Sequence, residues 1–367
     1  MSRQVDTGVM PQPPDAVIKA VSRLTGSLHR LADAPLPGPV RILNLVARST
    51  DSAIVSAFVD LGIADALGDE ELEVDVLAER IDAHPVGLLR LLRPAARLGL
   101  VCRRGTRYRL TSMGQHFRED HPMSFAPWTR YHSSPVALRA WESLAESVRT
   151  NSPAYASREG NSIWQWFAEH PDEERDFTGS MRTIADIDGP GQARLYPFED
   201  GQTVCDVGGG VGTLLSHVLR ANPTLRGVLV DGPGPAADAP AFLAERGVAD
   251  RVEVVEGDLF SPMSVEADVF LLKDVLHDWD DERCLTILRH VRAALRPDDR
   301  VGLVEMVQVP MEANRLVPMV DLEMLVLTDG GRQRTIEEFD ELFGRAGPRR
   351  VAVHDGLAHS VLVAVPA

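Results

Sequence analysis

The spacing of hydrophobic and polar residues changes near Gly201. After it, short apolar runs such as "TVCDVGG" and "RGVLVDG" alternate with longer amphipathic segments such as "RCLTILRHVRAAL". Strands that alternate with helices along a chain are typical of a parallel sheet with helices on both faces. The pattern therefore predicts an α/β domain over residues 199–367.

A different pattern precedes this domain. Residues 41–67 are apolar on more than one side, which predicts a helix ending at Gly68 and buried from two directions, as at a subunit interface. The next segment reads as helix, turn, helix and two short strands joined near Gly105, the pattern of a winged helix. The predicted organisation is an irregular arm at 1–38, a winged-helix-like domain at 39–118, a helical region at 119–198 and the α/β domain.

Charge narrows the choice of partners. The formal net charge is -16 and the isoelectric point about 5.1, so binding to nucleic acid or to an anionic membrane surface is disfavoured. The three cysteines lie far apart, which predicts small buried side chains and no metal site. The chain has no signal-peptide core and no run of about 18 apolar residues, so we expect a cytoplasmic protein.

Acidic and basic residues gather where the predicted strands end, the edge at which sheets of this class bind ligands. In chain order these residues are Asp206 with the turn that contains Gly208 and Gly210, then Asp231, then Asp258, then Lys273, Asp274, His277 and Asp278, and finally Glu305.

The glycine turn indicates a ligand that approaches the backbone closely. A nicotinamide cofactor would use a similar turn with an acid about 20 residues on, and Asp231 fits that role for either cofactor. Two features favour S-adenosylmethionine: the Gly-x-Gly-x-Gly spacing behind an acid, and the further acid Asp258, which is placed to accept from an adenine amino group.

Five segments together resemble a known family. "DVGGGVG", "EGDLF", "LLKDVLHDWDDE", "LVEMV" and "GGRQRTIEEFDELFGRAG" are similar to segments of the small-molecule O-methyltransferases of the plant caffeate and bacterial polyketide-tailoring type. The resemblance runs from about Ile42 to the end of the chain. It implies a Rossmann-like class I methyltransferase sheet, an N-terminal helical winged-helix dimerisation domain that makes a homodimer, and S-adenosylhomocysteine as product.

The resemblance also implies roles for single residues. His277 matches the general base, and Glu305 matches the carboxylate that orients it. The implied cofactor-binding residues are Asp206, Gly208, Gly210, Asp231, Asp258, Leu259 and Lys273. The implied pocket for an aromatic acceptor contains Trp128, Trp141, Phe177, Met181, Asp278 and Met324.

The chemistry supports this assignment independently. In methyl transfer from a sulfonium, the acceptor oxygen must be held in line with the bond that breaks, and its proton must be removed. A histidine with a near-neutral pKa is suited to remove that proton. One departure concerns the stretch "GGRQRT", where plant members carry a glutamate and this chain has Gln333. Glutamine cannot take a proton, so Gln333 is interpreted only as a hydrogen-bonding neighbour.

Two other functions stay open on the sequence. The same scaffold could methylate nitrogen or carbon, or use S-adenosylmethionine without methyl transfer; His277 in "LHDW" favours proton removal from a hydroxyl instead. A winged-helix regulator that senses a small molecule is the other alternative. It would need a basic recognition face, whereas the arginines of "LLRLLRPAARLGL" alternate with leucines suited to a core.

Overall fold

The computed structural model describes residues 36–154, 160, 162–308, 316–356 and 358–367. The predicted arm at 1–38 lies outside these residues except for its last three positions. The chain divides into two compact units, Met1–Ser134 and Pro135–Ala367. This boundary falls inside the predicted helical region 119–198, and the two units are described separately.

The first unit begins with two helices where the sequence predicts one. Helix α2 spans Gly38–Asp60 and α3 spans Ile63–Leu67. The single helix predicted over 41–67 is wrong because Gly62 takes a left-handed backbone conformation, with φ 60°, and breaks it. The apolar side chains of Ile42, Leu43, Leu45 and Val46 on α2 are 63–68% exposed.

Helix α2 also has the length and composition that would let it cross a membrane, and 17% of its most apolar window is buried.

The rest of the first unit has the predicted helix, turn, helix and hairpin. Its elements are β1 (Leu72–Glu73), α4 (Val74–Arg80), α5 (Pro85–Arg97), β2 (Val101–Arg104), β3 (Arg107–Leu110), α6 (Ser112–Gln115) and α7 (Ala126–Ser133). The strands form a small sheet in the order β1-β3-β2, turning at Gly105. Leu88 and Leu92 of α5 are buried, as the alternation with arginine predicts.

The second unit opens with helices α8 (Pro135–Glu142), α9 (Leu144–Thr150), α11 (Ile163–Glu169) and α12 (Pro171–Gln192). Helices α8 and α9 pack against α16 (Val317–Leu327), which is distant in sequence.

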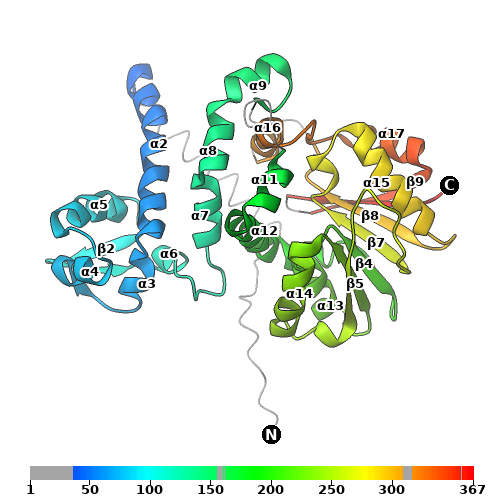
Figure 1. Ribbon diagram of the computed structural model, residues 1–367, viewed down its shortest axis with the longest axis horizontal. Coiled ribbons are helices and arrows are strands. Elements are labelled where there is room, and N and C mark those ends of the chain that lie inside the picture. Colours follow the sequence, from blue (N-terminus) through cyan, green and yellow to red (C-terminus); the bar gives the residue numbers. More distant parts are fainter. Residues whose placement is uncertain (1–35, 155–159, 161, 309–315, 357) are drawn as a thin grey trace, which may run out of the picture. The chain divides into compact units, whose positions relative to one another are not determined.

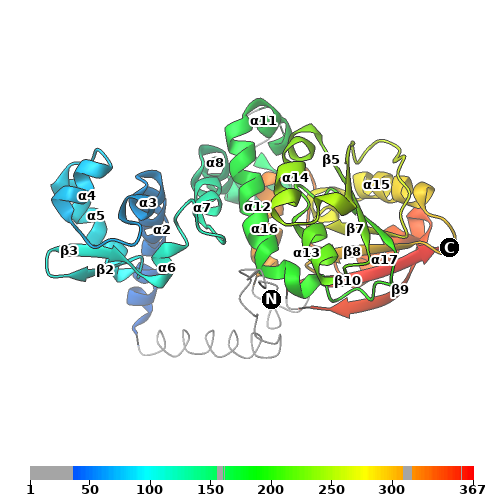
Figure 2. The same cartoon turned by 90° about the horizontal axis from the view of Figure 1, so that it is seen from below.

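A seven-stranded sheet forms the body of this unit. Its strands are β4 (Thr203–Val207), β5 (Arg226–Asp231), β6 (Val252–Glu256), β7 (Val269–Lys273), β8 (Arg300–Glu305), β9 (Pro348–Asp355) and β10 (Ser360–Pro366). The order is β6-β5-β4-β7-β8-β10-β9. The expected parallel sheet holds for β4 to β8 only, because β10 runs antiparallel to β8 and β9 antiparallel to β10. In Figure 2 these two strands form one edge of the sheet.

Helices cover both faces of the sheet, as the alternation predicts (Figure 1). Helices α13 (Thr213–Ala221) and α14 (Pro233–Glu245) pack with Val204 and Leu229 on one face. Helices α15 (Asp281–Ala294) and α17 (Ile336–Ala346) pack with Cys205 and Leu272 on the other.

The strand order reverses at β4. From β4 the chain moves outward to β5 and β6, then returns to β7 on the other side of β4 and continues to β8. A crevice at such a reversal lies at the carboxyl ends of the strands. The sequence-predicted residues on β4, β5, β7 and β8 therefore meet at this edge.

Candidate active site

The glycine turn after β4 holds three residues with left-handed backbone conformations. Gly208, Gly210 and Gly212 have φ of 70°, 60° and 87°. A Cβ at Gly209 would lie 2.5 Å from Cγ of Asp206, so the turn also packs tightly on the strand beneath it. A Cβ at Gly210 would meet no atom within 4 Å, and this glycine therefore faces open space.

Asp231, at the end of β5, holds the glycine turn in place by hydrogen bonds. Its carboxylate accepts hydrogen bonds of 2.7 Å from the backbone N–H of Gly210 and of Gly232. Burial raises the pKa of Asp231, although both N–H donors act to lower it.

Asp206, on the adjacent strand β4, is fully buried, and among the described residues no donor reaches either of its carboxylate oxygens with good hydrogen-bond geometry, although the backbone of Leu215 acts to lower its pKa. Burial, followed by the charge of Asp231, raises the pKa of Asp206 to about 7.

Asp258 and Leu259 lie in the loop after β6, beside the glycine turn. The N–H of Gly257 donates to the Asp231 carbonyl at 2.9 Å, and Leu259 side-chain atoms lie 3.6–3.7 Å from the Cβ position of Gly208. Asp258 is exposed and accepts from the N–H of Phe260 at 3.0 Å. The structure thus brings together the residues from β4, β5 and β6 that the sequence singled out.

His277 lies in a short 3-10 turn, Leu276–Asp278, between β7 and α15. Helix α15 begins just after this turn, at Asp281, and Asp280 caps it by accepting from the N–H of Arg283 at 2.8 Å.

Three side chains surround the imidazole ring of His277. The amide nitrogen Nε2 of Gln333 lies 2.9 Å from Nδ1, Oε2 of Glu305 lies 3.8 Å from Nδ1, and Oδ1 of Asp278 lies 3.5 Å from Nε2 of the ring. Burial lowers the pKa of His277 to about 4; Asp274 opposes this shift, whereas Lys273 and His359 add to it. The ring is therefore neutral at physiological pH.

Glu305 is fully buried at the end of β8. Its Oε1 accepts the N–H of Leu276 at 2.9 Å, while Oε2 has no partner. Burial, then the charge of Asp274, raises the pKa of Glu305 to about 8. A distance of 3.8 Å is too long for a hydrogen bond. The ring contact expected from Glu305 is thus made by Gln333, because Glu305 is directed to the backbone of the turn.

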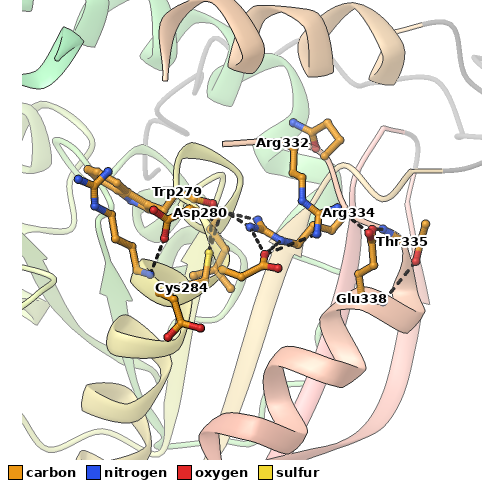
Figure 3. Close-up of polar contacts among 12 residues, drawn as sticks. Trp279, Asp280, Cys284, Arg332, Arg334, Thr335 and Glu338 are labelled. Carbon is orange, nitrogen blue, oxygen red and sulfur yellow. Dashed lines mark hydrogen bonds and ion pairs between the residues drawn. The ribbon is translucent and has the colours of Figure 1, made fainter. Parts of the chain in front are cut away.

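Arg334 holds the loop that carries His277 (Figure 3). This arginine is completely buried, and it donates to the carbonyls of Leu276 and Trp279, each at 2.8 Å, and to Asp281 at 2.7 Å. A planar guanidinium with five donors can bind several fixed acceptors at once. The motif "GGRQRT" contains this residue, but the sequence offered no sign of the role.

A buried charge network lies behind the ring. Asp274, whose φ is 50°, bonds to the ammonium of Lys273 and accepts from Nε2 of His359 at 2.9 Å. On its other side His359 contacts Asp188 and Gln192 of α12, at 3.4 and 2.9 Å. Burial alone would lower the pKa of His359, but Asp274 and Asp188 raise it to about 9. No sequence pattern pointed to His359, which is a lone histidine before a strand.

Asp274, His277 and Glu305 each place one ligand-type atom within 4.8 Å of the others. The sequence gives no metal-ligand spacing for this group, because the fold supplies Glu305 from another strand. We interpret the group as part of a charge network, since Asp274 is already bound to the cation of Lys273 and to His359.

Several aromatic rings contact one another next to the turn that carries His277. Trp279, next to the His277 turn, stacks on Trp164 of α11 at 5.8 Å and meets the edge of Phe260 at 4.8 Å. Phe177 of α12, predicted for the pocket, lies 5.8 Å from Trp164. Trp164 and Phe260 were not predicted as site residues, because the sequence does not show which aromatic residues of separate segments meet.

The other predicted pocket residues are spread over both units. Trp141 lies on α8 and the buried Met324 on α16, the two helices that pack together. Met181 of α12 is 39% exposed. Trp128 belongs to the first unit, where it stacks on His132 at 3.9 Å.

Two family models match the chain. Residues 141–349 match an O-methyltransferase domain, and residues 43–120 match an O-methyltransferase dimerisation domain. Among similar curated proteins, O-demethylpuromycin-O-methyltransferase of Streptomyces alboniger is 37% identical over 89% of this chain and 89% of its own. An 8-amino-8-demethylriboflavin N,N-dimethyltransferase of Streptomyces davaonensis is 33% identical over 82% of this chain and 87% of its own.

Solved structures agree with this match. An O-methyltransferase from neocarzinostatin biosynthesis, crystallised with S-adenosylmethionine and 2-hydroxy-5-methyl naphthoic acid, superimposes with a TM-score of 0.72. It is 32% identical, and the alignment covers 86% of this chain and 96% of that one.

The His359 network predicts a pH dependence of stability. A folded-state pKa of about 9 lies above the unfolded value of about 6.5. The stabilisation is therefore complete below about pH 6.5 and is lost as pH rises through about 9, on the order of 1–3 kcal/mol. Urea unfolding between pH 6 and 10 should show this loss in the unaltered protein and a smaller one in His359→Gln. His354→Gln, on the neighbouring strand, is the control; equal pH dependence in all three proteins would contradict the assignment.

Proposed function

The chain belongs to the S-adenosylmethionine-dependent O-methyltransferase family, and on that premise we propose that it methylates a hydroxyl of an aromatic natural product, with His277 as general base. The observation that carries the proposal is the position of a buried, neutral imidazole beside the glycine turn and an aromatic wall. The following paragraphs give the role of each group.

The strand ends fit the cofactor of this family. Glycines with left-handed backbone and open space at Gly210 leave room for a ligand close to the chain. The unpartnered carboxylate of Asp206 suits a ligand that brings positive charge, because an unpaired buried acid is costly. Asp231 would hold the ribose, Asp258 and Leu259 the adenine, and Lys273 would lie beside the cofactor. When bound, S-adenosylmethionine supplies a methyl group activated by its sulfonium.

His277 would remove the proton of the acceptor hydroxyl. Gln333 and Glu305 lie at Nδ1, whereas Nε2 faces only Asp278, at 3.5 Å, so Nε2 would be the ring atom that receives the proton. The neutral ring is ready to do so throughout the physiological pH range, because burial holds its pKa low. Glu305, which is held by the backbone of Leu276, keeps the turn that carries the ring in place.

The acceptor would lie against the aromatic residues of the second unit. Trp164 contacts both Phe177 and Trp279, and Trp279 follows His277 by two residues, so aromatic rings gather next to the loop of the base, which suits a flat aromatic molecule. The relative crystallised with 2-hydroxy-5-methyl naphthoic acid supports this class of acceptor. Trp141, Met181, Asp278 and Met324 would complete the pocket.

The first unit would make a homodimer. The dimerisation-domain model covers α2 from residue 43, and α2 presents the exposed apolar side chains of Ile42, Leu43, Leu45 and Val46. Such a face is stable in water only when it is covered, and a second copy of the chain is the cover that this family uses.

Incubation with methyl-deuterated S-adenosylmethionine and a panel of aromatic hydroxyl compounds tests the activity. Mass spectrometry should detect a labelled methyl ether, and fragmentation should locate the oxygen. The panel should include aromatic amines with no hydroxyl, because one relative is an N,N-dimethyltransferase. If only the amines were labelled, the proposed activity would have to be N-methylation and not O-methylation.

Replacement of the base tests the mechanism. His277→Ala should lower turnover about 10²–10⁴-fold, the usual contribution of a general base, and leave cofactor binding nearly unchanged. Calorimetry with S-adenosylhomocysteine measures the binding, and His354→Ala is the control. Unchanged turnover in His277→Ala, or lost cofactor binding, would contradict the base assignment.

Two glycines provide a matched test of the cofactor site. Gly210 and Gly201 both have positive φ, 60° and 81°, and a Cβ at either would meet no atom within 4 Å. Alanine at each position should therefore cause similar backbone strain, about 1 kcal/mol in free energy of unfolding. Only Gly210→Ala should weaken the binding of S-adenosylhomocysteine, by tenfold or more, in calorimetry. Equal affinity in the two variants would remove Gly210 from the cofactor site.

A further inference from the structure

Glu174 of α12 reaches the end of strand β5. Helices α12 and α14 run side by side (Figures 1 and 2), and the guanidinium of Arg182 lies 5.8 Å from the ring of Phe242. The carboxylate oxygens of Glu174 are 2.9 and 3.1 Å from the position that a Cβ would take at Gly234, in the first turn of α14. The charge of Glu174 also adds to the effect of burial in raising the pKa of Asp231. A carboxylate of α12 therefore lies close to the proposed ribose-binding acid.

The other acids in the first turn of α12 have side-chain partners. Asp172 pairs with Arg175. Glu173 accepts from the indole N–H of Trp166 at 3.2 Å. In the part of the chain that the structure describes, no donor hydrogen-bonds the carboxylate of Glu174. An acid at this end of a helix is stabilised by the helix dipole, which explains its position in the sequence but not the turn of its side chain toward Gly234.

The charged groups that face Glu174 are acidic. Burial, followed by the charge of Asp238 on α14, raises the pKa of Glu174, and Asp231 lies near enough for the two acids to repel each other. No cation of the described residues offsets these charges at Glu174. A ligand that donates hydrogen bonds without bringing negative charge would satisfy the carboxylate, and a hydroxyl group is such a donor.

Two features independent of Glu174 mark this strand end as a ligand site. The glycine turn is open at Gly210, and the fully buried carboxylate of Asp206 lacks a well-placed donor. Asp231 already accepts from the backbone N–H of Gly210 and of Gly232. A ribose presents two adjacent hydroxyls, so a second carboxylate would give each hydroxyl its own acceptor.

We propose that Glu174 is a second carboxylate of the cofactor site, which accepts a hydrogen bond from one ribose hydroxyl of S-adenosylmethionine while Asp231 holds the other. The inference rests on the proposed function, since it requires this cofactor. Helix α12 also carries Phe177 and Met181 of the proposed acceptor pocket, so the contact would connect the bound cofactor to a wall of that pocket.

Ligands that lack one hydroxyl test the contact. Calorimetry would compare S-adenosylhomocysteine with its 2′-deoxy and 3′-deoxy forms in the unaltered protein, in Glu174→Met and in the control Glu173→Met. Methionine keeps the length of the side chain and removes the acceptor. Glu174→Met should weaken S-adenosylhomocysteine about tenfold or more. Loss of one of the two hydroxyls should then cost less than in the unaltered protein, by about fivefold or more. Glu173→Met should match the unaltered protein.

Two results would overturn the proposal. One is equal affinity of Glu174→Met and the unaltered protein for S-adenosylhomocysteine. The other is the same loss for both deoxy ligands in all three proteins, because Glu174 would then contact neither hydroxyl.

Unfolding without ligand separates this role from a structural one. Glu174→Met should unfold at no lower temperature than Glu173→Met, because each removes one acid from the same helical turn and Glu174 has no described hydrogen bond to lose. Saturating S-adenosylhomocysteine should raise the Tm of the unaltered protein more than that of Glu174→Met. A lower Tm of unliganded Glu174→Met, with an equal rise on binding, would assign Glu174 to stability alone.

Kinetics add a readout in the complete reaction. Glu174→Met should raise KM for S-adenosylmethionine about tenfold and leave kcat nearly unchanged, as expected for a contact made equally in the ground and transition states. Glu174→Gln keeps one acceptor oxygen and should retain part of the affinity. If S-adenosylhomocysteine does not bind the unaltered protein, the proposed function fails and the inference with it. If it binds, and Gly210→Ala weakens it while Glu174→Met does not, only the inference fails.

Discussion

The candidate active site depends on the burial of one guanidinium. Arg334 is completely enclosed and uses its donors on the carbonyls of Leu276 and Trp279 and on Asp281 (Figure 3). Taking such a cation out of water is costly unless its hydrogen bonds are satisfied. The loop is therefore stabilised in the conformation that provides these acceptors. His277 lies between Leu276 and Trp279, whose carbonyls bind the guanidinium, so the hydrogen bonds of Arg334 also fix the backbone position of His277.

A second constraint is the number of ionisable groups at the same strand ends. Lys273, Asp274 and His359 satisfy one another as ions, and this pairing holds the pKa of Asp274 well below its usual range. Glu305 and Asp278 have no such cationic partner, and burial raises the pKa of both. Both shifts favour the uncharged carboxyl and so weaken the negative charge that could stabilise an imidazolium. Burial remains the main cause of the low pKa of His277, and the neutral amide of Gln333 adds no charge to oppose it.

Much of the fold could be predicted because its signals are local. The alternation of strands and helices after Gly201 and the hairpin at Gly105 are both patterns within a few residues. The prediction failed where distant contacts decide the outcome. The antiparallel strands β9 and β10 complete a sheet that begins with β4, and no short-range pattern contains that pairing. The break at Gly62 is different: the glycine is a local signal, which the apolar periodicity of the segment outweighed in the prediction.

The sequence by itself determined the residue types at the strand ends: the glycine turn, Asp231, Asp258, His277 and Glu305 follow from chain order, since parallel strands present their carboxyl ends at one edge. Only the tertiary structure decided which groups touch. It placed Gln333 rather than Glu305 in hydrogen-bond contact with His277. It also brought His359, from the connection between β9 and β10, to Asp274, and it stacked Trp164 on Trp279. The physical reason is that hydrogen bonds and charge pairing change over fractions of an ångström, a scale fixed by the packing of segments far apart in the chain.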